Sequence, residues 1–132
     1  MGTYGREGKN IVLEPRVKCY CSIDAVKRNL SETKFPKNFI KYIKGDVEYT
    51  LNDINNLPNK ISLLRLDTDW YKSTKKEMCV LFPLLENDGI LIVDDYGHWR
   101  GSKLAIDEYF NETNIIPEIK FIDYTDVKIK KK

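Results

Sequence analysis

The sequence predicts an α/β fold whose sheet is mostly parallel and ends in an antiparallel hairpin. Nearly continuous apolar runs at 61–67 and 89–95 are typical of strands buried inside a parallel sheet. Helical periodicity follows each run, and two short β-rich segments close the chain. The order strand, helix, strand, helix, strand with short connections indicates right-handed crossovers within one sheet.

The first 19 residues have no clear structural pattern. Gly2, Gly5 and Gly8 are evenly spaced, but no predicted strand precedes them, and residues 10–15 favour an extended segment. We therefore treat residues 1–19 as an uncertain amino-terminal segment and residues 20–132 as one domain.

The secondary structure of residues 22–55 is predicted from a helix cap, a helical periodicity and a short apolar run. Ser22 is a good N-cap for a helix that places Ile23, Val26 and Leu30 on one face and ends before Pro36. Residues 39–45 predict a strand. Residues 46–55 predict a helix or a loop.

Residues 61–85 predict a buried strand and a helix. The strand covers 61–67 and includes Arg65, which needs a partner carboxylate if the strand is buried. Thr74 and Glu77 match a capping box that opens a helix. The apolar face of this helix consists of Met78, Leu81, Phe82 and Leu85, and Pro83 should kink or shorten it.

The remainder of the chain predicts a strand, a helix and a hairpin. Gly89 begins the strand, which continues through the two aspartates at 94–95. Residues 101–113 predict a helix with Ala105, Ile106, Tyr109 and Phe110 on its inner face. Residues 119–125 and 126–130 predict an antiparallel pair of strands.

Composition limits the classes of function. The chain has 132 residues, 42% hydrophobic and 32% charged, with a net charge of +2, which gives no case for binding nucleic acid. No segment resembles a membrane span or a signal peptide. Cys19, Cys21 and Cys79 contain no C-x-x-C motif, so we expect free thiols and a cytoplasmic location. The basic residues 128–132 are interpreted as a solvated terminus.

Two pairs of aspartates follow the two apolar runs. Asp67 and Asp69 end the first run, and Asp94 and Asp95 end the second. Asp94 lies 27 residues after Asp67. This spacing fits one crossover, so both pairs should meet at the carboxyl edge of one sheet, where open α/β sheets bind ligands. Carboxylates gathered there favour Mg²⁺, with Mn²⁺ or Ca²⁺ as alternatives. The structural alternative is that Asp67 and Asp94 cap the following helices.

Several enzyme families end strands in such acids. Haloacid dehalogenase phosphatases carry D-x-D and D-D motifs, but with far more chain between them than is found here. Metal-dependent glycosyltransferases also carry D-x-D, usually on longer chains. A Mg²⁺-dependent phosphatase is therefore retained only as a remote alternative.

Residues 61–110 resemble the macrocin O-methyltransferase family along almost their whole length. The matching motifs are L-R-x-D-x-D-W-Y-x-S-T at 64–74, the proline-containing helix end at 82–85, G-x-L-I-x-D-D-Y-G-H-W at 89–99 and A-x-D-E-Y at 105–109. Segments 22–30 and 43–51 match more weakly. The resemblance implies a Rossmann-like class I methyltransferase sheet, of which residues 20–132 are a carboxyl-terminal portion.

The resemblance also implies a reaction and roles for residues. The family transfers a methyl group from S-adenosylmethionine to a sugar hydroxyl with the help of Mg²⁺. Carried over by motif, Asp67, Asp94 and Asp95 are the metal ligands. Asp69 and His98 are candidates for the base, and Asp67 is a further one.

The resemblance assigns weaker roles to other residues. Gly45 and Asp46 match the position that contacts the adenine side of the cofactor. Trp70, Tyr96 and Trp99 are expected either to wall the substrate or cofactor pocket or to belong to the core. His98 has the alternative role of a loop residue that orients a neighbour, and Asp69 that of a cap on a helix starting near Ser73.

The sequence departs from the family at its start. Family members have an additional amino-terminal region with a glycine-rich loop for the cofactor, and the chain begins too late to include it. Methyl transfer by this chain is therefore weighed against a non-catalytic metal- or sugar-binding remnant and against one half of a split enzyme. The expected partners are a sugar-containing acceptor and either a second copy or a complementing amino-terminal chain, with no nucleic acid and no membrane.

Overall fold

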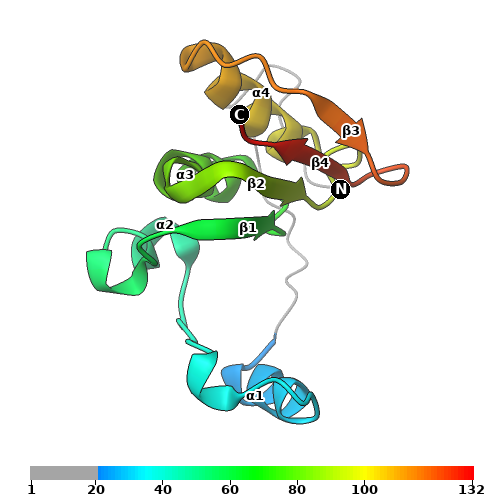
Figure 1. Cartoon of the computed structure of the whole chain (residues 1–132). Coiled ribbons are helices and arrows are strands. Elements are labelled where there is room, and N and C mark those ends of the chain that lie inside the picture. The colour runs from blue at the N-terminus through cyan, green and yellow to red at the C-terminus, as the bar shows by residue number, and fades with distance from the viewer. Residues whose placement is uncertain (1–20) are drawn as a thin grey trace.

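The computed structural model describes residues 21–132 as an α/β arrangement (Figure 1). The uncertain segment 1–19, with its glycines and the extended run at 10–15, lies outside the described residues. The helices are α1 (Ile23–Ser31), α2 (Val47–Thr50), α3 (Tyr71–Leu81) and α4 (Arg100–Glu112), and the short 3₁₀ helices are η2 (Lys37–Phe39), η3 (Ile54–Asn56) and η4 (Phe82–Leu84). The strands are β1 (Ile61–Leu66), β2 (Leu85–Val93), β3 (Ile119–Phe121) and β4 (Val127–Lys130).

The four described strands form one mixed sheet in the order β1-β2-β4-β3. β1 and β2 are parallel, with Leu64 opposite Leu91 and Leu66 opposite Val93. β4 runs antiparallel to both β2 and β3. The predicted crossover and the predicted terminal hairpin are therefore both confirmed.

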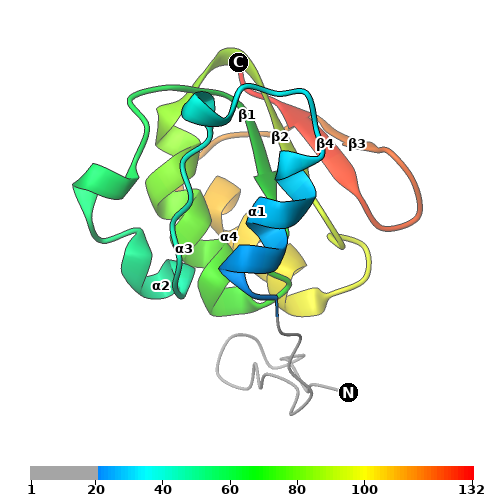
Figure 2. The same cartoon turned by 90° about the horizontal axis from the view of Figure 1, so that it is seen from below.

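Helices α3 and α4 cover one face of this sheet (Figures 1 and 2). The side chains that alternate toward them are fully buried, as the period of two along a strand requires. The core of the sheet face consists of Leu64, Leu66, Leu91, Val93, Val127 and Ile129. The predicted inner face of α4 is confirmed, since Ala105, Ile106, Tyr109 and Phe110 are all buried.

The opposite face of β1 is open among the described residues. Leu63 keeps 60% of its surface exposed, and Arg65 on the same face is also exposed. The apolar run at 61–67 indicated a strand covered on both faces, which is wrong for residues 21–132. Only the face that carries Leu64 and Leu66 is packed.

Helix α3 begins earlier than the capping box predicts. Its N-cap is Trp70, which makes no side-chain cap hydrogen bond, and Thr74 and Glu77 lie buried inside the helix. Glu77 instead accepts a hydrogen bond from the Thr68 hydroxyl in the preceding loop. The effect of Pro83 is confirmed, because α3 ends at Leu81 and gives way to the 3₁₀ turn η4.

The segment before β1 lies beyond the β1 edge of the sheet (Figure 1). α1 has Ser22 as its predicted N-cap, whose hydroxyl accepts a hydrogen bond from the Ala25 amide at 3.1 Å. No residue of α1 is buried. The predicted strand at 39–45 is wrong: no described strand lies beside it, so its backbone has no ladder partner.

Within residues 21–132, no helix is both long enough and apolar enough to cross a lipid bilayer.

Candidate functional site

The topology brings three strand ends to one edge of the sheet. β1 and β2 are parallel, so their carboxyl ends coincide, and the antiparallel β4 begins at the same edge. Asp67 follows β1 directly, Asp94 and Asp95 follow β2, and Asp126 precedes β4. The expected meeting of the two aspartate pairs is thus observed, with a further carboxylate from the hairpin.

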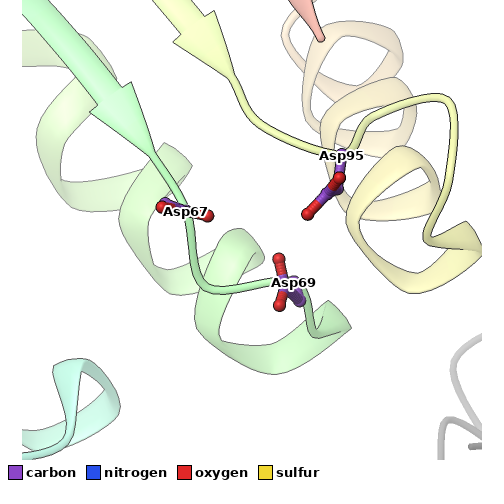
Figure 3. Close-up of side chains that lie close together, drawn as sticks. All are labelled: Asp67, Asp69 and Asp95. Carbon is purple, nitrogen blue, oxygen red and sulfur yellow. The ribbon is translucent and has the colours of Figure 1, made fainter. Parts of the chain in front are cut away.

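The carboxylates form two groups that share Asp95. Asp67, Asp69 and Asp95 each offer an oxygen within 4.8 Å of the others, and their side chains surround a common space (Figure 3). Asp94, Asp95 and Asp126 form the second group by the same measure. Of the predicted ligands, Asp95 belongs to both groups, while Asp67 and Asp94 belong to one each.

Arg65 connects the two groups. Its guanidinium lies 2.9 Å from Oδ2 of Asp67 and 3.4 Å from Oδ2 of Asp94. The partner carboxylates that Arg65 was expected to need are therefore the site aspartates themselves. The ion pair lies on the open face of the sheet rather than in its core.

Two of the site aspartates, Asp69 and Asp95, have an unusual backbone conformation. Asp69 has φ 65° and Asp95 has φ 57°, both in the left-handed region that non-glycine residues seldom occupy. Such conformations persist where surrounding contacts hold them, and they cluster at functional sites. The alternative that Asp67, Asp69 or Asp94 caps the helix that follows it is wrong, because the N-caps of α3 and α4 are Trp70 and Trp99.

Burial and like charges raise the pKa of two of these carboxyls. Burial, followed by the charges of Asp95 and Asp67, raises the pKa of Asp69 to about 6. The neighbouring Asp67 carboxyl, followed by burial, raises the pKa of Asp94 to about 7. In contrast, the hydrogen bond from the Asp95 amide holds the pKa of Asp126 below its ordinary value.

The donor set fits a hard divalent cation. Oδ1 of Asp69 is buried and accepts no hydrogen bond, although a buried carboxylate oxygen ordinarily has a partner. Carboxylate oxygens from two or three aspartates are the ligands that Mg²⁺ takes in proteins. A cation here would offset the repulsion that raises these pKa values.

The loop that carries His98 also carries Tyr96 and Trp99, two of the three aromatic residues predicted for the pocket. The ring of His98 is 4.8 Å from that of Trp99, which in turn lies 4.9 Å from Trp70 on the loop after β1. His98 is exposed, and its charge opposes the rise in the pKa of Asp69. Tyr96 instead belongs to the core, where its hydroxyl donates to Asp107 at 2.6 Å.

Gly45 and Asp46 lie at the start of α2. Gly45 has φ 135°, and a Cβ on it would approach Cγ2 of Thr50 to 2.7 Å, so both its conformation and its surroundings favour glycine. Asp46 is the N-cap of α2, and its Oδ1 accepts a hydrogen bond from the Glu48 amide at 2.9 Å. The structure thus gives both residues a local role in the backbone.

Asp126 is the site residue that sequence reasoning missed. Its signal was present, since the predicted hairpin strand starts at this residue. Recognising it required knowing that β4 lies beside β2 in antiparallel orientation, which brings the start of β4 to the site edge.

Comparisons with known proteins agree with this fold. The family model described as Macrocin-O-methyltransferase matches residues 10–131. Demethyldecarbamoylnovobiocin O-methyltransferase from Streptomyces niveus is 30% identical over 102 residues, which is 77% of this chain and 38% of that protein.

Solved structures of O-methyltransferases superpose on the described fold. The O-methyltransferase NovP has a TM-score of 0.78 at 27% identity, covering 93% of this chain and 47% of NovP. CalS11, a TDP-rhamnose 3′-O-methyltransferase of calicheamicin biosynthesis, has a TM-score of 0.57 at 20% identity, covering 67% of this chain and 39% of CalS11, and shows the fold alone. The chain spans less than half the length of each of these relatives. With the family model matching residues 10–131, the chain belongs to the macrocin O-methyltransferase family.

Proposed function

We propose that this protein takes part in S-adenosylmethionine-dependent methyl transfer to a hydroxyl of a sugar or a glycosylated small molecule, assisted by Mg²⁺. The observation that carries the proposal is the convergence of Asp67, Asp69, Asp94 and Asp95 at the carboxyl ends of two parallel strands, in two carboxylate groups that share Asp95. Family membership supports methyl transfer as the reaction and does not favour the phosphatase alternative.

Asp67, Asp94 and Asp95 are the residues that would hold the cation. They come from both strand ends. The Arg65 guanidinium forms ion pairs with Asp67 and Asp94, so these carboxylates already interact with one positive charge. When bound, a divalent cation lowers the pKa of a hydroxyl that it contacts and so favours its deprotonation near neutral pH.

Asp69 would take the proton of the acceptor hydroxyl. Its Oδ1 is buried without a hydrogen-bond partner, and its carboxylate lies close to those of Asp67 and Asp95 (Figure 3), where a base could accept a proton. His98 is the second candidate for this role, since its ring lies on the adjoining loop.

The two tryptophans would position the acceptor. Trp70 and Trp99 pack edge to face and are half-buried, and each lies on a loop that also carries site aspartates. Aromatic rings of this kind offer a rigid apolar wall to a ring-shaped ligand. Gly45 and Asp46 remain our proposal for the adenine side of the cofactor.

Cation and cofactor titrations of the full 132-residue chain test the proposal. We expect Mn²⁺, used in place of Mg²⁺ because it can be followed by electron paramagnetic resonance, to bind one site. Asp95→Asn should weaken this binding at least about tenfold, because Asp95 belongs to both carboxylate groups.

Asp88→Asn is the matched control. Asp88 lies on β2 away from the site and is 81% exposed, so its loss removes one charge without removing a ligand. Absence of Mn²⁺ binding would refute the metal site. Absence of S-adenosylmethionine binding, with and without Mg²⁺, would refute cofactor binding by this chain.

A second candidate function is one half of a split methyltransferase. In that case the residues that bind S-adenosylmethionine would come from a complementing chain rather than from residues 21–132. Among residues 21–132, the outer edge of β1 pairs with no strand, and the relatives are more than twice as long as the part that matches. A free edge is a template for pairing with another strand. This candidate predicts Mn²⁺ binding that is lost in Asp95→Asn, together with no detectable binding of S-adenosylmethionine.

A further inference from the structure

Two loops meet beside the carboxylates. The loop after β2 (residues 94–99) contacts the turn between β3 and β4 (residues 122–126). The Asp95 amide donates to Oδ1 of Asp126 at 3.1 Å, and the Gly97 amide donates to the Thr125 carbonyl at 2.7 Å. These two bonds tie the aspartate loop to the hairpin.

The turn is itself held in one conformation. Oδ1 of Asp123 accepts hydrogen bonds from the amides of Thr125 and Asp126, at 2.9 and 2.8 Å. The Ile122 amide donates to the Asp126 carbonyl at 2.8 Å. Asp126 is therefore presented to the aspartate loop from a fixed backbone.

The two loops are in direct van der Waals contact at Gly97. A Cβ on this glycine would lie 2.7 Å from the Tyr124 carbonyl oxygen and 3.3 Å from Cα of Thr125. No side chain fits between the backbones there. A movement of the turn toward Gly97 would therefore press on the backbone of the aspartate loop.

Oδ1 of Asp126 accepts from the Asp95 amide at 3.1 Å. The Thr125 hydroxyl, a single donor, lies 3.0 Å from this oxygen and 3.3 Å from Oδ1 of Asp123. The residue it holds, Asp95, has the left-handed φ of 57°, a conformation that needs outside contacts to persist.

We propose that Asp126 is a positioning residue that fixes Asp95 in its site-facing conformation through the Asp95 amide. The inference rests on the proposed function, in which Asp95 binds the cation. Partners that orient metal ligands matter almost as much as the ligands, and their loss typically costs about 10–100-fold in metal affinity.

Substitution at Asp126 separates an orienting acceptor from a direct ligand. Asp126→Asn keeps an oxygen that accepts from the Asp95 amide but removes the charge, so Mn²⁺ affinity should stay within about threefold of wild type. Asp126→Ala removes the acceptor, so affinity should fall about 10–100-fold. In the metal-free chain, hydrogen exchange of the Asp95 amide should accelerate in Asp126→Ala and stay slow in Asp126→Asn.

Asp88→Asn again controls for the loss of one charge and should leave both measurements unchanged. Asp126→Ser, whose hydroxyl is too short to reach the Asp95 amide, replaces Asp126→Ala if the latter does not fold.

Each outcome bears on the inference. Equal affinity in wild type and Asp126→Ala overturns it while leaving the proposed function intact. Equal weakening in Asp126→Asn and Asp126→Ala overturns it in favour of direct ligation. Wild-type protein that binds no Mn²⁺ refutes the proposed metal site, and the inference falls with it.

Discussion

Glu77 is a buried acid whose charge the fold opposes, and Glu77→Gln tests that conclusion. Its side chain, 5% exposed, lies inside α3 and accepts a hydrogen bond from the Thr68 hydroxyl. Burial raises its pKa from 4.5 to about 7, against the smaller opposing effect of the Thr68 bond. Gln has nearly the same shape and keeps an oxygen for Thr68, but it never ionises.

The sign and size of the effect follow from proton linkage. Between about pH 4.5 and 7 the folded chain retains a proton that the unfolded chain has released, so wild-type stability falls as pH rises through this window. A difference of about 2.5 pKa units corresponds to about 3 kcal/mol. Glu77→Gln does not lose this stability because Gln does not ionise. Its free energy of unfolding should match that of wild type near pH 4 and exceed it by about 3 kcal/mol near pH 8.

Urea unfolding in metal-free buffer from pH 4 to pH 8.5 measures the difference. Glu86→Gln is the control, since Glu86 is exposed and its ion pair with Lys60 lies in solvent, where such pairs add little to stability. The pKa values of Asp69 and Asp94 are also raised, so the quantity compared is the difference between the two profiles. Parallel profiles for wild type and Glu77→Gln would refute the reasoning.

Two further substitutions test the packing. Met78→Ala removes a side chain that is 0% exposed between α3 and the sheet, and should lower the free energy of unfolding by about 2–5 kcal/mol; a loss below about 1 kcal/mol would contradict the assigned core. Gly97→Ala places a Cβ against the Tyr124 carbonyl, and should both destabilise the fold by about 1–3 kcal/mol and weaken Mn²⁺ binding. An unchanged melting temperature together with unchanged Mn²⁺ affinity would show that the two loops separate freely.

Several elements could be predicted from the sequence because their signals are local. The Ser22 cap, the inner face of α4 and the helix stop near Pro83 each depend on residues within a few positions of one another. The convergence of the aspartate pairs also followed, since one crossover of 27 residues fixes two neighbouring parallel strands.

Other features depended on packing that local signals do not describe. Thr74 and Glu77 have the letters of a capping box, yet the helix starts at Tyr71, where the loop after β1 turns onto the sheet. Residues 39–45 have the composition of a strand, but a strand exists only where a neighbour supplies its hydrogen bonds, and none of the described strands lies there.

By itself, the sequence determined the α/β fold class, the inner face of α4, and the aspartates that follow β1 and β2. Only the tertiary structure decided that Asp126 joins them, because β4 must first lie antiparallel beside β2. It also decided that Arg65 pairs with Asp67 and Asp94 and that Glu77 is buried. Distances between segments far apart in the chain, and the burial that follows from them, are properties of the packed fold rather than of any local pattern.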